Sequence, residues 1–277
     1  MTEVFTERTP RVVAARKLTR RAGRDAAGEF LAEGPQAVRE ALAADPPPRE
    51  LFVTEAAAAR HGDLVERAHA AGVPVSAVTD RAAAALSETA SPQGIVAVCR
   101  FLDVSLAAAL AGTARLVVLL ADIRDPGNAG TVLRSADAAG ADAVVLAGDS
   151  VDPYNGKSVR AGAGSLFHLP VVRGAGLDAA LTAARAAGLT VLAADGAGER
   201  DLDDLPELAG PTAWLFGNEA WGLPAELGAR ADARVRIPIS PRAESLNLAA
   251  AAAVCLFASA RAQRAAGGAG AGSRAIP

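Results

Sequence analysis

Short apolar runs alternate with longer stretches of helical spacing in the first third of the chain. Runs of this length, bounded by Gly, Pro and Asp, predict strands, and the stretches between them predict helices. The expected strands are residues 29–33, 51–54, 73–78 and 95–99, and the expected helices are residues 35–44, 62–71 and 80–87. Pro35 suits the first position of a helix, which needs no backbone N–H. The pattern predicts a small α/β sandwich over residues 29–101.

The second part of the chain opens with residues 116–121, a continuous apolar run typical of a parallel strand buried on both faces. Further strands are expected at 144–146, 169–172, 189–193, 212–216 and 235–239, and helices at 128–139, 156–163, 177–187 and 245–265. Alternating strands and helices predict a parallel sheet with helices on both faces. We expect a linker at 102–113, a domain at 114–266 and a disordered Gly- and Ala-rich tail at 267–277.

The composition is that of a globular protein, and 277 residues suffice for two domains. The longest apolar run, residues 248–258, is too short to cross a bilayer, and the N-terminus lacks the apolar core of a signal peptide. Cys99 and Cys255 lie far apart in apolar segments, which predicts two reduced core residues in a cytoplasmic protein. The three histidines make no metal-ligand spacing with the cysteines, so we expect no metal site. Because the longest apolar run is too short to cross a bilayer, we also expect no membrane partner.

The net charge of −3 hides a basic stretch near the N-terminus, residues 1–28, where seven cations follow one another without an acid: Arg8, Arg11, Arg16, Lys17, Arg20, Arg21 and Arg24. One interpretation is a solvated, partly disordered arm. The other is a phosphate-binding arm that holds RNA. In that case we expect the contacts at Arg16, Lys17, Arg20 and Arg21.

Polar residues appear in the second domain where packing residues would be expected. Gly217 and Glu219 directly follow the apolar strand 212–216, and a carboxylate beside Trp and Leu is costly unless it has a partner or a ligand. The loop 122–130 precedes a helix that Asn128 can cap, and helix N-terminal amides attract phosphate. Arg134 lies about a turn and a half inside that helix, within reach of such a phosphate. The alternative is a capped surface helix with an ordinary arginine.

Several functional classes lack support. The segments around Gly162 and Gly196 do not complete a dinucleotide-binding glycine fingerprint. The phosphate-binding loop of nucleotide hydrolases, Gly-x4-Gly-Lys-Ser/Thr, is not complete either, because Gly156-Lys157-Ser158 has Val151 where that pattern requires its first glycine. His168 has no acid placed to orient it beside Ser165, which argues against a nucleophile pair. The segment 91–94, Ser-Pro-Gln-Gly, is a predicted turn that either contacts a partner or only reverses the chain.

Taken together, three motifs resemble those of the SpoU (TrmH) family of the SPOUT superfamily. They are Asn128-x-Gly130-x3-Arg134, then Gly217-x-Glu219-x2-Gly222-Leu223, then Ile237-Pro238 followed by Ser245-Leu246-Asn247. The resemblance extends over residues 116–260. Residues 33–42 more loosely resemble the substrate-binding domain that precedes it in members acting on ribosomal RNA.

The resemblance implies S-adenosylmethionine-dependent methylation of a ribose 2′-hydroxyl in RNA. It also implies a trefoil knot in the C-terminal domain and a homodimer formed through the knot and the last helix. Cofactor contacts are then expected at Gly217, Ile237, Leu246, Leu215 and Asn218. Arg134 is expected either to accept the 2′-hydroxyl proton with help from a phosphate or to position that phosphate. Asn128, Glu219, Ser245 and Asn247 complete the expected catalytic set.

The N-terminal domain favours ribosomal RNA, with 23S the expected species. Transfer RNA is the alternative substrate. A non-catalytic RNA-binding or ribosome-assembly factor that keeps the knot is the alternative class, although intact motif residues argue against it.

Overall fold

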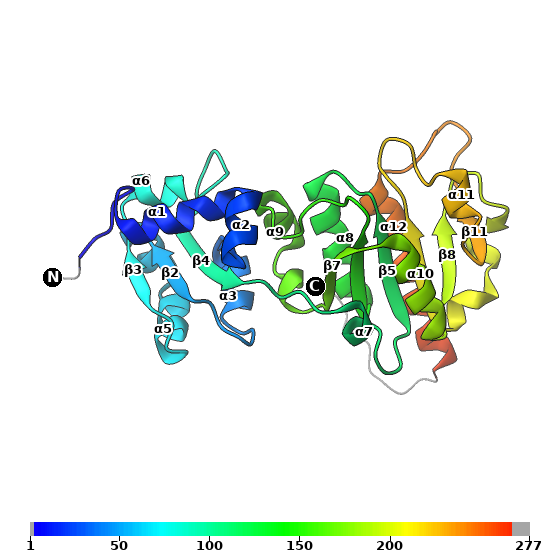
Figure 1. Cartoon of the computed structure of the whole chain (residues 1–277), viewed down its shortest axis with the longest axis horizontal. Coiled ribbons are helices and arrows are strands. Elements are labelled where there is room, and N and C mark those ends of the chain that lie inside the picture. Colours follow the sequence, from blue (N-terminus) through cyan, green and yellow to red (C-terminus); the bar gives the residue numbers. More distant parts are fainter. Residues whose placement is uncertain (1–2, 268–277) are drawn as a thin grey trace. The chain divides into compact units, whose positions relative to one another are not determined.

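The computed structural model describes residues 3–267, which form two compact units (Figure 1). The first unit contains residues up to Asp103 together with Pro126–Arg134 and Val151–His168. The second contains Val104–Asp125, Ser135–Ser150 and the chain from Leu169 onward, so it begins inside the predicted linker. The predicted disordered tail lies outside the described residues, apart from Gly267.

A mixed four-stranded sheet forms the centre of the first unit. Its order is β1-β4-β2-β3, with β1 and β2 antiparallel to β4 and with β2 parallel to β3. The strands are β1 (Glu29–Glu33), β2 (Glu50–Val53), β3 (Val75–Ala77) and β4 (Ile95–Arg100). All four match predicted strands to within about two residues at their ends, and the residues of β1, β2 and β4 are almost all buried.

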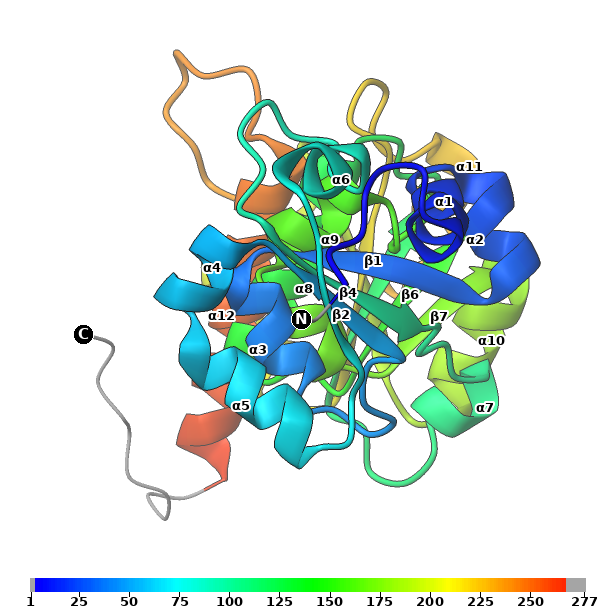
Figure 2. The ribbon, with the colours of Figure 1, turned by 90° about the vertical axis from the view of Figure 1, so that its left-hand side faces the viewer.

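Helices cover both faces of this sheet, with α1 and α6 on one face and α3 and α5 on the other (Figure 2). The helices and 3-10 turns of the unit are α1 (Pro10–Arg16), η1 (Lys17–Thr19), α2 (Arg21–Ala27), α3 (Pro35–Ala41), α4 (Glu55–Arg60), α5 (Gly62–Ala70), α6 (Asp80–Ala85), α9 (Gly156–Gly162) and η2 (Ser165–Phe167). Pro35 begins α3 as predicted.

The basic stretch is helical over residues 10–19 and 21–27, with only Arg20 extended between them, so its interpretation as a partly disordered arm is wrong for these residues. Val12, Ala15 and Leu18 recur at three-residue spacing and pack into the same core cluster as strand residues of β1, β2 and β4. Burial of this apolar stripe anchors α1 and η1 to the sheet.

The second unit is built on a seven-stranded, entirely parallel sheet of order β7-β6-β5-β10-β8-β11-β9. The strands are β5 (Leu116–Ala121), β6 (Ala143–Ala147), β7 (Val171–Ala175), β8 (Thr190–Ala194), β9 (Arg200–Asp201), β10 (Thr212–Phe216) and β11 (Ala233–Arg236). The predicted parallel α/β class is confirmed. The knot stays a prediction that rests on the family resemblance.

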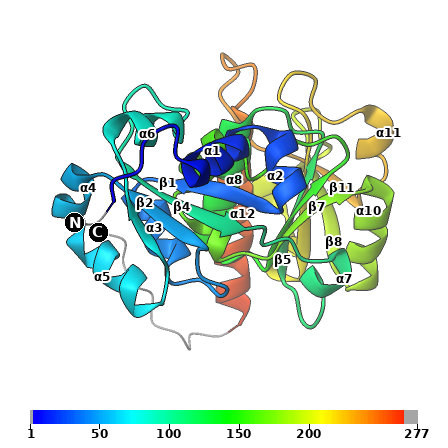
Figure 3. The same ribbon diagram turned by 60° about the vertical axis from the view of Figure 1, so that its left-hand side comes forward.

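Helices lie on both faces of the parallel sheet, and Figure 3 shows α10 (Leu177–Ala186) and α12 (Leu248–Ala266) on opposite sides. One core cluster joins α10 to alternate residues of β5 and β10 such as Leu119 and Leu215. On the other face the indole of Trp214 donates to Ser259 Oγ of α12 at 2.8 Å. The remaining elements are α7 (Leu106–Ala109), η3 (Leu202–Asp204), η4 (Pro206–Ala209) and α11 (Ala225–Gly228), while α8 (Pro126–Ala139) carries residues of both units.

Three of the differences between predicted and observed boundaries concern the motifs. The strand expected at 235–239 ends at Arg236, the helix expected from Ser245 begins at Leu248, and α8 begins at Pro126. Asn128 therefore lies inside the first turn of α8, and its predicted role as the helix cap is wrong. Proline at the first helical position explains the earlier start, since it brings a suitable φ and lacks the N–H that would be unpaired there.

No helix within residues 3–267 is long and apolar enough to cross a membrane.

Candidate functional site

A cleft of about 340 Å³ opens at the carboxyl ends of β8, β10 and β11 in the second unit. Ligands of open α/β sheets bind at this edge of the sheet, and the volume is within the usual range for a small-molecule site, about 300–1,000 Å³. Its walls come from the ends of these strands, the turn after β10 and the segment before α12. Four of the five predicted cofactor residues line it: Gly217, Asn218, Ile237 and Leu246. Leu215 does not, because its side chain is fully buried in the core of the sheet.

The turn after β10 is closed by its own backbone. The Asn218 N–H donates to Gly222 O at 3.0 Å, and the Gly222 N–H donates back to Asn218 O at 2.8 Å. A Cβ at Gly217 would lie 2.4 Å from Gly222 O, so only glycine fits there. Gly222 has a φ of +69°, which also favours glycine. The spacing of the two glycines is therefore required by the turn that forms this wall of the cleft.

Asn218 and Glu219 hold the loop that follows β5. The Asn218 side-chain amide donates to Asp122 O at 2.7 Å. The Glu219 carboxylate accepts the backbone N–H groups of Arg124 and Asp125, each at 3.1 Å. A carboxylate that accepts two amides fixes the backbone of that loop. The second sequence motif thus sets the conformation of the loop leading into α8, which carries the first motif.

The lining of the cleft suits a ligand with a positive centre and apolar parts. Of the described residues that line it, three carry a carboxylate, Asp195, Glu219 and Glu244, and none carries a basic group. Asp195 is paired with Arg234 at 3.2 Å, so its charge is largely balanced, whereas the amides that Glu219 accepts are neutral and leave its negative charge in the cleft wall. Apolar groups of Phe216, Val235, Ile237 and Leu248 line the same cleft. These residues fit the sulfonium, adenine and aliphatic groups of S-adenosylmethionine.

The third motif lies at the start of α12. Ser245 and Leu246 line the cleft, and Leu246 remains 39% exposed. Asn247 caps the helix, since its side-chain oxygen accepts the N–H groups of Ala249 at 2.9 Å and Ala250 at 3.4 Å. The cap stabilises the start of α12 beside the cleft, and the expected catalytic role of Asn247 stays a prediction.

Arg134 and Asn128 lie on α8 among the residues grouped with the first unit, and neither lines the cleft. Arg134 is exposed. Its catalytic role and that of Asn128 stay predictions.

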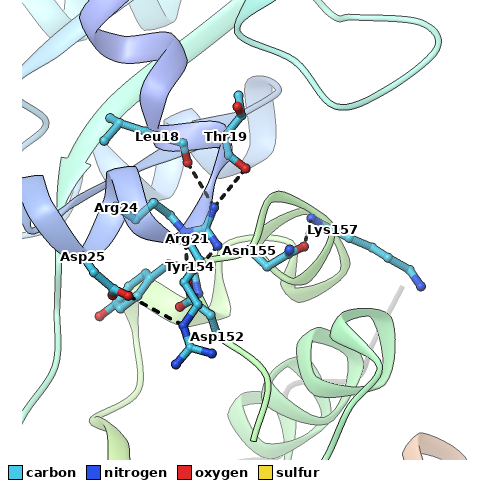
Figure 4. Close-up of polar contacts among 9 residues, drawn as sticks. All are labelled: Leu18, Thr19, Arg21, Arg24, Asp25, Asp152, Tyr154, Asn155 and Lys157. Atoms are coloured by element: carbon cyan, nitrogen blue, oxygen red, sulfur yellow. Dashed lines mark hydrogen bonds and ion pairs between the residues drawn. The ribbon is translucent and has the colours of Figure 1, made fainter.

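The four predicted RNA contacts of the basic stretch are all exposed, and we call them the arm cations: Arg16, Lys17, Arg20 and Arg21. Arg21 makes one ion pair, with Asp25 at 3.6 Å. Arg24 differs from them, because its side chain is 3% exposed and is bonded on all sides (Figure 4). Arg24 is therefore not available to bind phosphate, and the predicted phosphate-binding surface does not include it.

Arg24 joins the basic stretch to the segment 152–155. Its Nε and Nη2 lie 2.8 and 2.7 Å from Asp152 Oδ2, and its Nη1 donates to Leu18 O at 3.0 Å and Thr19 O at 3.2 Å. Asp152 Oδ1 accepts the Tyr154 N–H at 3.0 Å. The Tyr154 ring packs on Phe30 and Phe101 with centroid distances of 4.6 and 4.4 Å. A buried ion pair and an aromatic cluster thus seat α2 in the first unit.

Several residues of these sites were not predicted from the sequence. Asp195 and Gly196 line the cleft because they follow β8, and the general preference for ligand binding at strand carboxyl ends was the available signal. The Arg24–Asp152 pair joins residues 128 positions apart, which a single sequence does not reveal.

Two protein families match this chain, one over most of the C-terminal part and one over the N-terminal part. Residues 115–257 match the model of the SpoU rRNA Methylase family, and residues 9–97 match that of the MRM3-like substrate binding domain. The chain is 34% identical to the 23S rRNA (guanosine(2553)-2′-O)-methyltransferase of Bacillus subtilis over 91% of this chain and 96% of that protein.

Solved structures are also similar over nearly the whole chain. The AdoMet-bound rRNA methyltransferase of Sinorhizobium meliloti has a TM-score of 0.82 at 34% identity, over 94% of this chain and 98% of that one. The SpoU methyltransferase AviRb of Streptomyces viridochromogenes, in complex with the cofactor AdoMet, has a TM-score of 0.81 at 31% identity, over 93% of this chain and 100% of that one. The chain belongs to the SpoU rRNA methylase family and is an S-adenosylmethionine-dependent RNA 2′-O-methyltransferase.

Proposed function

We propose that this methyltransferase acts on 23S ribosomal RNA. The observation that carries the proposal is the presence, in one chain, of the acidic and apolar cleft behind Gly217 and of a unit matching a substrate-binding domain. The Bacillus subtilis relative, similar along almost its full length, is named for a 23S nucleotide. A ribosomal RNA substrate and two buried free cysteines also favour the cytoplasm as the compartment.

The cofactor contacts follow from the cleft. We infer that Gly217 and Asn218 offer backbone groups on one wall, and that Ile237 and Leu246 pack on the apolar parts from the other. Leu215 acts from beneath by packing β10 into the core. When bound, S-adenosylmethionine supplies a methyl group on a positively charged sulfur. Glu219 and Glu244 favour that charge electrostatically.

Arg134 is the residue proposed to act on the RNA. A free guanidinium keeps its proton to roughly pH 12 or beyond, so Arg134 accepts a proton only if a phosphate and burial act together. The other version has Arg134 hold the phosphate beside the reacting ribose while another group takes the proton. Glu219 serves both versions, because it fixes the loop from which α8 starts.

A homodimer is the proposed assembly. Val254 and Phe257 lie three positions apart on α12 and remain 42% and 40% exposed. The other side of the same helix is buried, through residues such as Ala252 and Leu256. A second copy that covers these side chains would remove the apolar surface from water.

Transfer of tritiated methyl from S-adenosylmethionine to overlapping transcripts of 23S ribosomal RNA tests the function directly. We expect one fragment to be labelled on a ribose by the unchanged protein, and Arg134→Ala to abolish labelling while calorimetric binding of the cofactor persists. Arg39→Ala, which removes an exposed arginine of α3, is the matched control. Labelling of transfer RNA alone, or of no RNA, contradicts the proposal. Loss of cofactor binding in Arg134→Ala would make that residue structural.

A further inference from the structure

A second cavity, of about 290 Å³, lies wholly within the first unit. The end of β1, the start of α3, the loop between α6 and β4 and one side of α9 form its walls. The cofactor cleft shares none of its residues. The volume is at the lower end of the range for small-molecule sites, which suits one base-sized group.

One wall is held rigidly by a buried carboxylate. Glu33 is 8% exposed and accepts hydrogen bonds from Ser87 Oγ at 2.5 Å and Thr89 Oγ1 at 3.3 Å. Arg160 Nη1 completes the set at 3.1 Å from the Glu33 carboxylate. A network of this kind fixes its members in place before any ligand arrives. The negative charge of Glu33 and the positive charge of Arg160 are paired in this network, so the cavity wall has no excess charge that would attract a phosphate.

The opposite wall carries polar side chains that are not hydrogen-bonded to the described part of the protein. Gly34 has a φ of +95°, and a Cβ there would lie 2.8 Å from Gln93 Oε1, so glycine lets the Gln93 side chain lie directly over the backbone. Within residues 3–267 neither the Gln93 amide nor the Ser91 hydroxyl has a hydrogen-bond partner. Arg160 uses one nitrogen on Glu33, and its remaining N–H groups stay available to a ligand.

A side-chain amide, a hydroxyl and a neutralised guanidinium match the donor and acceptor edge of a nucleobase. Unpaired bases of RNA are recognised in this way, on edges exposed by unstacking, and glutamine can make two hydrogen bonds to one base. We propose that this cavity, the Gln93 pocket, takes one unpaired base of the RNA substrate. The inference rests on the proposed function. It assigns sequence selectivity to the first unit, in addition to the phosphate attraction of the arm cations.

Binding of RNA without cofactor tests the pocket separately from methylation. Fluorescence anisotropy with overlapping 23S transcripts identifies the fragment bound most tightly by the full chain. An abasic nucleotide is then placed at each unpaired position of that fragment in turn. We expect one abasic position to weaken binding by the unchanged protein about tenfold or more, as loss of a two-bond base contact would.

The variant Gln93→Ala should bind the intact fragment about tenfold more weakly and should show no additional loss at that abasic position. Ser91→Phe, which fills the mouth from an exposed loop, should behave similarly, and Glu66→Ala on the exposed side of α5 should match the unchanged protein. Circular dichroism checks that each variant is folded. The pocket is refuted if every abasic position is tolerated, or if Gln93→Ala and the abasic penalty are additive. Loss of methyl transfer with this coupling intact would refute the proposed function alone.

Discussion

The buried ion pair of Arg24 and Asp152 permits a quantitative prediction for the first unit. Asp152→Asn keeps the shape of the side chain and the oxygen that accepts the Tyr154 N–H, but it removes the charge. The guanidinium of Arg24 then remains 3% exposed without a counter-ion. Arg24→Met creates the reverse situation, with the Asp152 carboxylate buried beside one remaining backbone donor.

The expected cost follows from burial on both sides. Removing one partner of a buried ion pair destabilises a protein by about 3–5 kcal/mol, because the other charge stays uncompensated. Such a loss changes the folded-to-unfolded ratio by roughly two to four orders of magnitude. The double variant removes both charges, yet it leaves the Leu18 and Thr19 carbonyls without their donor, at about 1–3 kcal/mol for a buried unpaired group. The two single variants together should cost about 6–10 kcal/mol and the double variant about 2–6 kcal/mol, so we expect the double variant to cost less than the sum by about 4 kcal/mol.

Urea titration of the full chain, followed by hydrogen exchange and mass spectrometry, measures these free energies and assigns them to a unit. Protection should fall in α2, β1 and residues 151–155, while β5 and β10 keep theirs. The exposed pair of Arg39 and Asp63 is the matched control, and Arg39→Met should leave the titration unchanged. If each single variant lay within about 1 kcal/mol of the parent, or if their costs simply added, the pair would not be the coupled buried contact described above.

Four further outcomes are expected. Gly217→Ala should abolish calorimetric binding of S-adenosylmethionine because its Cβ meets the Gly222 carbonyl, whereas Gly176→Ala, with no neighbour within 4 Å, should bind normally. Alanine at all four arm cations should lower the salt dependence of RNA binding by up to about three units of logarithmic slope; an unchanged slope would exclude them as phosphate contacts. Asn247→Ala should cost about 1 kcal/mol and speed hydrogen exchange in the first turn of α12, and unaltered exchange there would contradict the capping role. Burial raises the pKa of both cysteine thiols, so the native chain should resist a thiol reagent at mildly alkaline pH and react fully once denatured; rapid labelling of the native chain would contradict their burial.

Strands buried on both faces were the elements that the sequence predicted best. Residues 116–121 and 212–216 were predicted with the observed ends, since each is a continuous apolar run with polar or small residues around it. The cleft could also be predicted in outline, because Gly217 and Glu219 follow a buried strand directly. Leu215 was the exception among the cofactor residues, since adjacent strand residues point to opposite sides.

Other features depend on contacts that a single sequence does not reveal. The strand β9 has two residues and exists because it pairs with β11. The helices α1 and α2 were not predicted, because the run of arginines was interpreted by its charge alone. The spacing of Val12, Ala15 and Leu18 would have indicated a helix with one buried face. The cap formed by Asn247 was not predicted, because asparagine serves in caps and in catalytic sites alike and only the neighbouring amides reveal the cap.

The hydrogen bonds from the backbone amides of Arg124 and Asp125 to Glu219 couple stretches of chain about 95 positions apart. Anyone who grafts the turn after β10 from a relative, to alter how tightly the methyl donor is held, would also disturb the loop at 122–125. The two stretches are best exchanged together. Chimeras that mix their origins should lose methyl transfer even when each half comes from an active enzyme.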